Sequence, residues 1–164
     1  MGIKEMSPEE IQIAIDGGYR AAGNVFRCMM DVLEARYGKE ETRQVAEEVV
    51  RKKAQTAGEM AATRFGKGGL ENLAEAHRAA FPGLEVLEFS STRYVIRDHN
   101  CPIVEGWRRS GLSEDRIREL GDHYCWGDLY FAQCFNPRIR LQFQARLAAR
   151  DSYCQWIFTL EDAD

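Results

Sequence analysis

The chain has 164 residues, which is enough for one domain with a sizeable core but short for two, so we expect a single domain over residues 1–164. Its 22 basic and 26 acidic side chains leave a net charge of −4, which disfavours nucleic-acid binding because duplex binders carry a basic excess. No apolar run approaches the roughly 18 to 20 residues that cross a bilayer, and segment 1–10 lacks the apolar centre of a signal peptide. We therefore expect a cytoplasmic protein that binds neither membranes nor nucleic acids.

The first part of the chain, residues 1–82, is predicted to be helical. Ser7, Pro8 and Glu10 form a helix start signal, since a serine cap followed three residues later by glutamate makes a capping box. Apolar residues then recur at helical spacing, and Gly38 predicts the end of this helix. Two more helices are expected over about 40–65 and 70–80. The first of these carries an apolar stripe at Val45, Val49, Ala57 and Met60.

The second part, residues 83–164, changes to shorter, β-prone runs. Residues 84–89 and 92–97 predict a hairpin, and residues 138–147 and 153–161 predict a second one with clean apolar and polar alternation on its first strand. Between the hairpins we expect a helical stretch from Pro102 and then a long helix from Ser113 to about Phe135. The predicted fold is therefore α+β, with a helical N-terminal half packed on an antiparallel sheet of about four strands and a long helix between the two hairpins.

Five cysteines are spread over these elements: Cys28, Cys101, Cys125, Cys134 and Cys154. An odd number of cysteines, without a recognisable secretion signal, argues against a disulfide framework and for reduced thiols. A free cysteine usually packs as a small apolar side chain, and we expect this of Cys28 and Cys134 in particular. The same interpretation competes with a chemical role for Cys154, which shares its strand face with aromatic residues.

The candidate chemistry lies in two short segments and the last strand. Cys101 stands between a predicted strand and a helix, where free backbone N–H groups and the helix dipole stabilise a thiolate. His99 is its neighbour in sequence, and His123, Cys125 and Asp128 follow on the next helix. Both histidines serve equally well as structural hydrogen-bonding groups.

Metal binding is the alternative use of these side chains. Zinc takes thiolate and imidazole ligands, and Cys101, His123, Cys125 and Cys154 are the available set. The chain has no C-x-x-C pair, and the gaps between the cysteines are long and irregular, so the spacing favours a metal only weakly. We expect no cofactor, and a metal ion stays open as an alternative.

Four segments of the second half together resemble the L-2-amino-thiazoline-4-carboxylic acid hydrolase family. They are Asn100-Cys101-Pro102-Ile103, His123-Tyr124-Cys125-Trp126-Gly127-Asp128, Cys134-Phe135-Asn136-Pro137-Arg138 and Asp151-Ser152-Tyr153-Cys154-Gln155-Trp156-Ile157-Phe158. The resemblance implies a hydrolase that opens the ring of a small cyclic amidine-like carboxylate by adding water to a C=N carbon. A looser likeness to vinyl-reductase-type ligand-binding domains implies the alternative, a small-molecule or metal sensing domain without turnover.

Such a reaction needs a nucleophile, an acid or base, and an anchor for the substrate carboxylate. Our hypothesis makes Cys101 the nucleophile, with His99 or His123 as acid/base and Asp128 orienting it. Arg97 or Arg138 holds the carboxylate, and we expect Cys125, Trp126 and Cys154 to line the site. A variant uses a metal-bound water held by some of the four metal-ligating candidates. The expected partner is a small molecule, and a homo-oligomer is left open.

Overall fold

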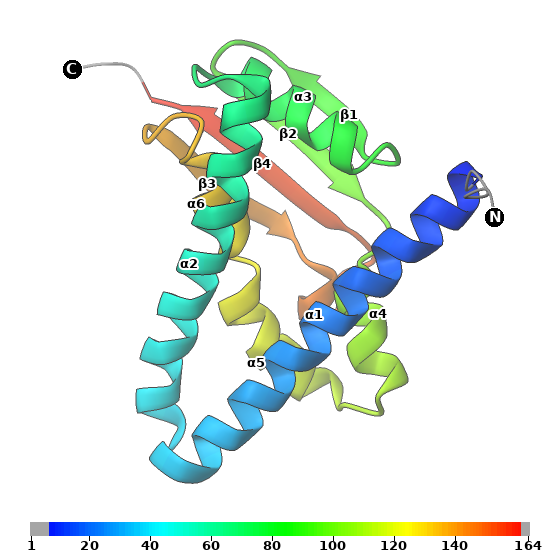
Figure 1. The fold of residues 1–164 in the computed structure, drawn as a ribbon, viewed down its shortest axis with the longest axis vertical. Helices are drawn as coiled ribbons and strands as arrows, with labels where there is room; N and C mark the ends of the chain where they lie inside the picture. Colours follow the sequence, from blue (N-terminus) through cyan, green and yellow to red (C-terminus); the bar gives the residue numbers. More distant parts are fainter. Residues whose placement is uncertain (1–6, 162–164) are drawn as a thin grey trace, which may run out of the picture.

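Two long helices open the fold and diverge like the arms of a V (Figure 1). A computed structural model describes residues 7–161, beginning with helix α1 (Pro8–Tyr37) and helix α2 (Lys39–Phe65). The capping box predicted for α1 is confirmed, because the backbone N–H of Glu10 donates to Ser7 Oγ at 3.2 Å and the Ser7 N–H donates to the Glu10 carboxylate at 2.8 Å. Gly38, with φ of +82°, allows the sharp reversal between the two helices.

The apolar stripe predicted for α2 is wrong. Val45, Val49 and Met60 are 41%, 37% and 71% exposed, and the buried side of α2 consists mainly of small residues. These are Thr42, Ala46, Val50, Ala54, Gly58 and Ala62. Small side chains allow the neighbouring helices to approach closely, and that contact outweighs the larger apolar area of the other face.

The sheet has four antiparallel strands in the order β1-β2-β4-β3. Helix α3 (Leu70–Ala80) leads into strands β1 (Glu85–Phe89) and β2 (Arg93–Asp98), and strands β3 (Ile139–Ala145) and β4 (Cys154–Leu160) follow later in the chain. A short 3-10 helix, η1 (Leu147–Ala149), stands between β3 and β4. The predicted α+β class and both hairpins are confirmed.

The predicted helical stretch from Pro102 is confirmed, but the long helix predicted from Ser113 to about Phe135 is divided in two, so that three helices lie between the hairpins. They are α4 (Pro102–Arg109), α5 (Glu114–Tyr124) and α6 (Gly127–Ala132). The break between the last two, at Cys125 and Trp126, turns α6 toward α2. Gly127, at the start of α6, lies close to Val50 of α2, where an added Cβ atom would make an ordinary contact at 3.4 Å from Val50 Cγ1.

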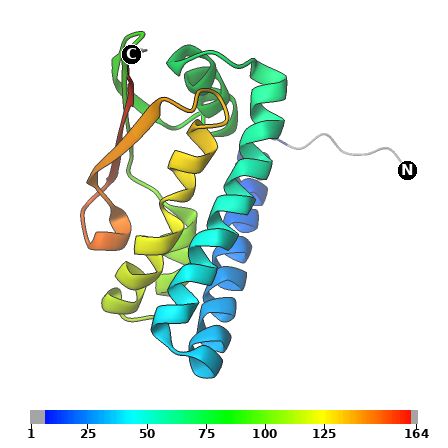
Figure 2. The same ribbon diagram turned by 90° about the vertical axis from the view of Figure 1, so that its left-hand side faces the viewer.

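All the helices lie on one side of the sheet (Figure 2). The sheet face that they cover carries Tyr94, Ile96 and Phe158, each at most 3% exposed. The predicted alternation of β3 is confirmed, since Ile139 is buried and Arg140, Gln142 and Gln144 of the opposite face are exposed. Trp156 of β4 packs against both groups of core residues, one under α1 and α4 and the other under α3.

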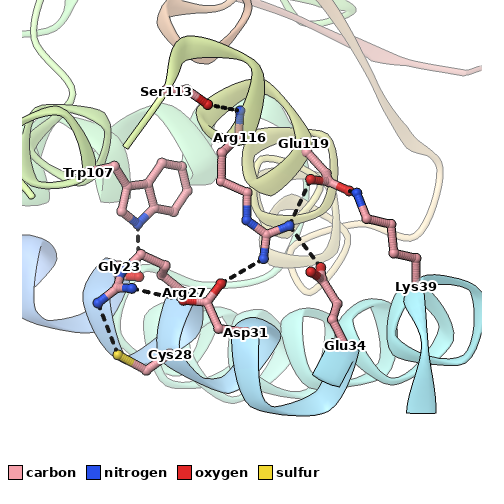
Figure 3. Close-up of polar contacts among 10 residues, drawn as sticks. All are labelled: Gly23, Arg27, Cys28, Asp31, Glu34, Lys39, Trp107, Ser113, Arg116 and Glu119. Atoms are coloured by element: carbon pink, nitrogen blue, oxygen red, sulfur yellow. Dashed lines mark hydrogen bonds and ion pairs between the residues drawn. The ribbon is translucent and has the colours of Figure 1, made fainter. Parts of the chain in front are cut away.

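Helix α5 is fastened to the base of the V by Arg116 (Figure 3). Its guanidinium group donates to Asp31 at 2.8 Å, to Glu34 at 2.9 Å and to Glu119 at 2.7 Å. Cys28, predicted to be a core residue, is exposed instead and accepts a hydrogen bond from Arg27 at 3.2 Å. None of the helices among residues 7–161 is long and apolar enough to span a membrane.

Candidate active site

Four of the side chains singled out in the sequence come together where the helices meet the start of β4. Cys101 precedes α4, Cys125 follows α5, Asp128 lies on α6 and Cys154 begins β4. The charge of Asp128 raises the pKa of each of the three thiols, which places all three within electrostatic reach of it. We call the complete group the Asp128 cluster; its members are Tyr19, Lys53, Cys101, Tyr124, Cys125, Asp128, Cys154 and Trp156.

Asp128 is the centre of this group. Its carboxylate accepts a hydrogen bond from Trp156 Nε1 at 2.7 Å, which fixes its orientation. Burial raises the pKa of Asp128 to about 6, and this effect outweighs the opposing effects of the Trp156 hydrogen bond and the Lys53 charge. Some of its surface stays accessible to solvent, and this combination is typical of a side chain on the wall of a hollow. A carboxyl group with a pKa near neutrality is suited to proton transfer.

Cys101 is the residue before α4 and is only partly exposed. Burial raises the pKa of its thiol, and the backbone N–H groups of Val104 and Ile103 act in the opposite direction. The predicted stabilisation of a thiolate by the helix start is therefore present but is smaller than the effect of burial. Neither N–H group makes a capping hydrogen bond of regular geometry to the sulfur. The thiol consequently needs a base nearby to become a nucleophile.

Cys125 and Cys154 complete the thiols of the cluster. Burial raises the pKa of Cys125 well above its ordinary value, and burial raises that of Cys154 to about 12. The Cys154 sulfur also accepts a hydrogen bond from the Leu147 N–H at 3.3 Å. Asp98 is paired with Cys154 across β2 and β4, and its charge acts on both Cys154 and Cys101. Cys125 and Cys154 are therefore both protonated at neutral pH and form apolar walls of the site.

Lys53, Tyr124 and Tyr19 were not identified from the sequence. Lys53 donates to the Tyr124 hydroxyl, and its ammonium group lies 4.3 Å from the centre of the Tyr124 ring. The side chain of Lys53 has exposed surface, yet burial among surrounding protein atoms lowers its pKa. Tyr19 faces the group from α1, where burial and the charges of Tyr124 and Asp128 raise its pKa. The two arms of the V thus bring a tyrosine and a lysine to Asp128.

The opposite charges of Lys53 and Asp128 act on each other without direct contact. The Asp128 charge raises the pKa of Lys53, and the Lys53 charge lowers that of Asp128. Among the described residues, however, no ion pair within 4.0 Å joins them, and Lys53 is bonded to Tyr124 instead. A cation and a carboxylate that interact without an ion pair between them each keep the capacity to bind a polar ligand.

The structure places His99 and Arg97 outside this group. His99 is 65% exposed at the end of β2, where its ring packs edge-on against Tyr153. Arg97 lies on the sheet face away from the helices, because strand side chains alternate and its neighbours Ile96 and Asp98 take the covered face. The Arg97 guanidinium donates to Gln155 at 3.0 Å and lies over the Tyr153 ring. The strand alternation thus separates both residues from Cys101.

Arg138 also lies away from Asp128. It precedes β3 and is bonded through its carbonyl to the Glu161 N–H, at the end of β4 opposite to Cys154. The length of β4 separates the two ends by about 20 Å. Neither arginine proposed as carboxylate anchor is therefore at the thiols. The cation whose charge acts on Asp128 is Lys53, while the charge of Arg146 acts on Cys125 and Arg108 interacts with Cys101.

His123 and Trp126 line a different feature, an open groove of about 910 Å³ between α2 and α5. Trp126 is 41% exposed and stacks edge-on against Phe143, and it also borders a smaller hollow beside β3. Burial lowers the pKa of His123, and the charge of Asp122 partly offsets this. Helical geometry explains the separation, because residues one and two positions apart on a helix point in different directions.

No group of three or more His, Cys, Asp or Glu side chains within residues 7–161 has an arrangement that could hold a metal ion. Of the four candidate ligands, His123 lies in the outer groove, apart from the thiols.

The chain was compared with known proteins and solved structures. The sequence profile of the L-2-amino-thiazoline-4-carboxylic acid hydrolase family matches residues 19–158, a range that contains every member of the Asp128 cluster. No curated protein matches the chain. Among solved structures, the chain is similar to a trafficking protein particle complex subunit 3 from Naegleria fowleri, a structure described as covalently bound to palmitic acid.

The likeness to this subunit has a TM-score of 0.58 and covers 88% of this chain and 96% of that one. With 12% sequence identity it concerns the fold alone. The family profile, in contrast, spans most of the sequence from α1 to β4. The chain therefore belongs to the L-2-amino-thiazoline-4-carboxylic acid hydrolase family.

Proposed function

We propose that the protein is a hydrolase that adds water to the C=N carbon of a small cyclic amidine-like carboxylate, with the Asp128 cluster as its active site. The observation that carries this proposal is the convergence of three side chains on Asp128 of α6. They are Cys101 at the start of α4, Lys53 of α2 and Tyr124 of α5. Family membership supports the reaction class, and the residue roles are inferred from their positions.

In the proposed mechanism Asp128 is the general base and Cys101 the nucleophile. Above pH 6 the Asp128 carboxylate takes the Cys101 proton while the sulfur forms a bond to the C=N carbon. The proton passes from Asp128 to the ring nitrogen, and the carbon becomes tetrahedral. The bond from this carbon to the other ring heteroatom, the ring sulfur in a thiazoline, then breaks as a C=N bond to the exocyclic nitrogen forms, and the leaving atom takes the proton that this nitrogen releases. Water adds to the same carbon, and the bond to the Cys101 sulfur breaks. The carbon gains the oxygen of water, and the thiol is restored.

Lys53 is the proposed anchor for the substrate carboxylate. The charge of its ammonium group acts on Asp128, and the group is held by Tyr124, whose own pKa burial raises to about 12. A neutral Tyr124 keeps its proton at neutral pH and can donate to a substrate oxygen or nitrogen. This arrangement takes the place of the arginine anchor that we expected from the sequence.

The first experiment measures turnover of L-2-amino-thiazoline-4-carboxylate by the purified chain and by three variants. We expect Cys101→Ala and Asp128→Asn each to lower kcat by about 10²-fold to 10⁴-fold, and Lys53→Met to act mainly by raising KM. Cys28→Ala is the matched control, because it removes an exposed thiol outside the cluster and should leave turnover unchanged. Full turnover by Cys101→Ala would overturn its role as nucleophile.

The pH dependence tests the base separately. The pKa of Asp128 predicts that kcat/KM rises as pH passes about 6 and levels off above it. Asp128→Asn should remove this limb, while His99→Ala and His123→Ala should keep it. Loss of the limb in either histidine variant would return the acid/base role to that histidine.

The second candidate function is ligand binding without turnover. It is favoured by the raised pKa values of all three cluster thiols, which make each of them a poor nucleophile without assistance. The fold is also shared with a subunit whose structure is described as carrying covalent palmitic acid. Intact-protein mass spectrometry distinguishes the two candidates. A stable adduct on a cluster thiol with no turnover supports binding, whereas an unmodified protein that turns over substrate supports the hydrolase.

A further inference from the structure

Helix α1 has a second apolar face, which the described part of the chain leaves uncovered. Eight small or apolar residues alternate at spacings of three and four along it, and all eight are exposed. They are Ile11, Ala14, Gly18, Ala21, Val25, Cys28, Val32 and Ala35, and we call them the α1 seam. Val25 is 70% exposed, although valine is an apolar side chain that folding usually buries.

The seam lies opposite the core-facing side of the same helix. The core side is marked by Gly23, Phe26 and Met30, which are all buried. Figure 2 shows α1 and α2 together as the layer of the molecule farthest from the sheet. The strict seven-residue repeat is the pattern of a helix that packs along its length against another helix. A helix that serves only its own core carries one apolar stripe, so a second one needs a separate explanation.

We infer that the α1 seam pairs with the same seam of a second copy of the chain, with the two α1 helices antiparallel. An antiparallel pair centred near Gly23 brings the larger residues of one helix opposite the small residues of the other. Ile11 then meets Ala35 of the second copy, Val32 meets Ala14, Val25 meets Ala21 and Cys28 meets Gly18. The summed volume is similar in the three layers that pair isoleucine or valine with alanine, which favours gap-free packing, and the smaller Cys28–Gly18 layer requires a closer approach of the helices.

The residues that flank the seam agree with this arrangement. On one side lie Ile15, Ala22 and Met29, so Ile15 of one helix approaches Met29 of the other and the two copies of Ala22 meet at the symmetry axis. On the other side the two copies of Asn24 meet, and amide groups can donate to and accept from each other. The charged residues Arg20 and Arg27 lie outside these contacts. The symmetric pair therefore brings no like charges together.

A parallel pair is less favourable for the same sequence. Parallel helices in register place identical residues opposite one another, so Ala14 would face Ala14 and Ile11 would face Ile11. Three successive layers of small residues, at Ala14, Gly18 and Ala21, would be followed by three layers of larger ones, at Val25, Cys28 and Val32, which leaves gaps in the first set and crowds the second. The distribution of sizes along the α1 seam thus selects the antiparallel orientation.

The size of the contact is sufficient for a dimer. The seam runs over 24 residues, from Ile11 to Ala35, and is about 36 Å long. A helix pair of that length buries on the order of 1,000 Å² in total, which is near the lower limit for a specific interface. The exposed Val45 and Val49 of the adjoining α2 offer further apolar area. We therefore expect a dimer that dissociates in the micromolar range rather than an obligate one.

Sedimentation equilibrium of the intact chain tests the proposal. We expect a dimer at high micromolar concentration and a shift of at least tenfold toward monomer for Val25→Glu, which places two charges beside the symmetry axis. Ile13→Glu is the matched control, because Ile13 is 59% exposed on α1 but lies outside the seam, and it should dimerise like the parent chain. A parent chain that is monomeric throughout, or equal effects of both variants, would overturn the proposal.

Cross-linking determines the orientation without relying on a destabilised interface. In a Cys28→Ser background, Ala22→Cys places two thiols within about 10 Å across the axis, so a short bis-maleimide should link them. Ala14→Cys places its two thiols about 27 Å apart in the antiparallel pair and should give no link. A mixture of Ile11→Cys and Ala35→Cys chains should form the mixed product. Efficient linking of Ala14→Cys to itself would show a parallel pair and contradict the antiparallel proposal.

Discussion

Burial of Asp128 works against the stability of the folded chain at neutral pH. The pKa of its carboxyl group is about 6 in the folded chain, against an ordinary value of 3.8. Between these pH values the folded chain binds more protons than the unfolded chain, so the free energy of unfolding falls as pH rises. Above pH 6 the charged form lowers stability by on the order of 1 to 3 kcal/mol. The proposed role of Asp128 as general base accounts for a buried carboxylate at this position.

Asp128→Asn is therefore predicted to make the protein more stable while it removes activity. The asparagine side chain can still accept the Trp156 hydrogen bond, and it carries no charge to desolvate. We expect the free energy of unfolding in urea to increase by about 1 kcal/mol or more at pH 7, and little at pH 4, where the parent Asp128 is already protonated. Asp122→Asn, at an exposed ion pair with Arg146, should show no such gain. An equal change at both pH values would contradict the prediction.

The contribution of His77 to the free energy of unfolding has the opposite pH dependence to that of Asp128, so the two contributions need to be distinguished. Burial lowers its pKa to about 4, and its Nδ1 atom has no hydrogen-bond partner in the described structure. Between pH 4 and 6.5 the unfolded chain binds more protons at this position, so its contribution to stability is lost as pH falls. Measurements on variant and parent at the same pH cancel this contribution.

The sequence was a good guide to some site residues and a poor guide to others. Cys101, Cys125, Asp128 and Cys154 were found because each stands in a short motif where reactive side chains are dense. Lys53 gave no signal, since a lysine on a charged helix usually points to solvent. Its place beside Asp128 depends on how α2 crosses α6, which is a tertiary contact without a local pattern.

Helix α6 is held against α2 by a contact that only glycine permits. A Cβ atom at Gly58 would lie 2.7 Å from Cys134 Sγ and 2.8 Å from the Phe131 carbonyl oxygen. This contact sets the position of α6, and with it the position of Asp128 relative to Lys53. The close approach therefore links the packing of two helices to the geometry of the proposed site.

Gly58→Ala should thus destabilise the protein despite alanine's better helix propensity. We expect a loss of about 1 to 3 kcal/mol, because the backbone carbonyl of Phe131 cannot move without shifting α6. Glu59→Ala, at the next and exposed position, should change stability by less than about 0.5 kcal/mol. Thermal unfolding of both variants measures the difference. Stabilisation by Gly58→Ala would show that α2 and α6 can move apart without a loss of folding free energy.

The helices and strands that the local sequence pattern predicted well are those whose ends carry strong sequence signals. Ser7 and Gly38 bound α1, and the alternation of β3 matches its buried and exposed faces. The break between α5 and α6 was missed because Cys125 and Trp126 have helical backbone angles and carry no proline. What turns the chain there is the packing of α6 on α2, which acts only once both helices exist.

At the scale of the whole molecule, Arg116 connects α5 with the lower part of α1. Its side chain is 19% exposed and is bonded to three carboxylates, those of Asp31, Glu34 and Glu119. Burial alone would lower the pKa of Arg116, but these bonds outweigh it and raise the pKa. Without the guanidinium group the three carboxylates would repel one another.

Arg116→Met is accordingly predicted to lower the free energy of unfolding by about 2 to 4 kcal/mol. Arg43→Met is the control, since Arg43 is 61% exposed and pairs only with Glu40, and should have an effect below about 0.5 kcal/mol. Urea unfolding at low and high salt measures both. An effect of Arg116→Met no larger than that of the control would show that the network contributes little.

The strand order has a consequence for the way in which the chain is made. The two inner strands of the sheet are β2 and β4, and β4 is the last strand in sequence to be synthesised. Until β4 emerges, β2 and β3 have no strand between them, and Trp156 is not available to orient Asp128. A nascent chain at this stage therefore holds the helical layer and one hairpin, without the inner strand that supplies Trp156 and Phe158 to the core. Completion of the sheet and assembly of the Asp128 cluster are thus expected to be a single late event in biosynthesis.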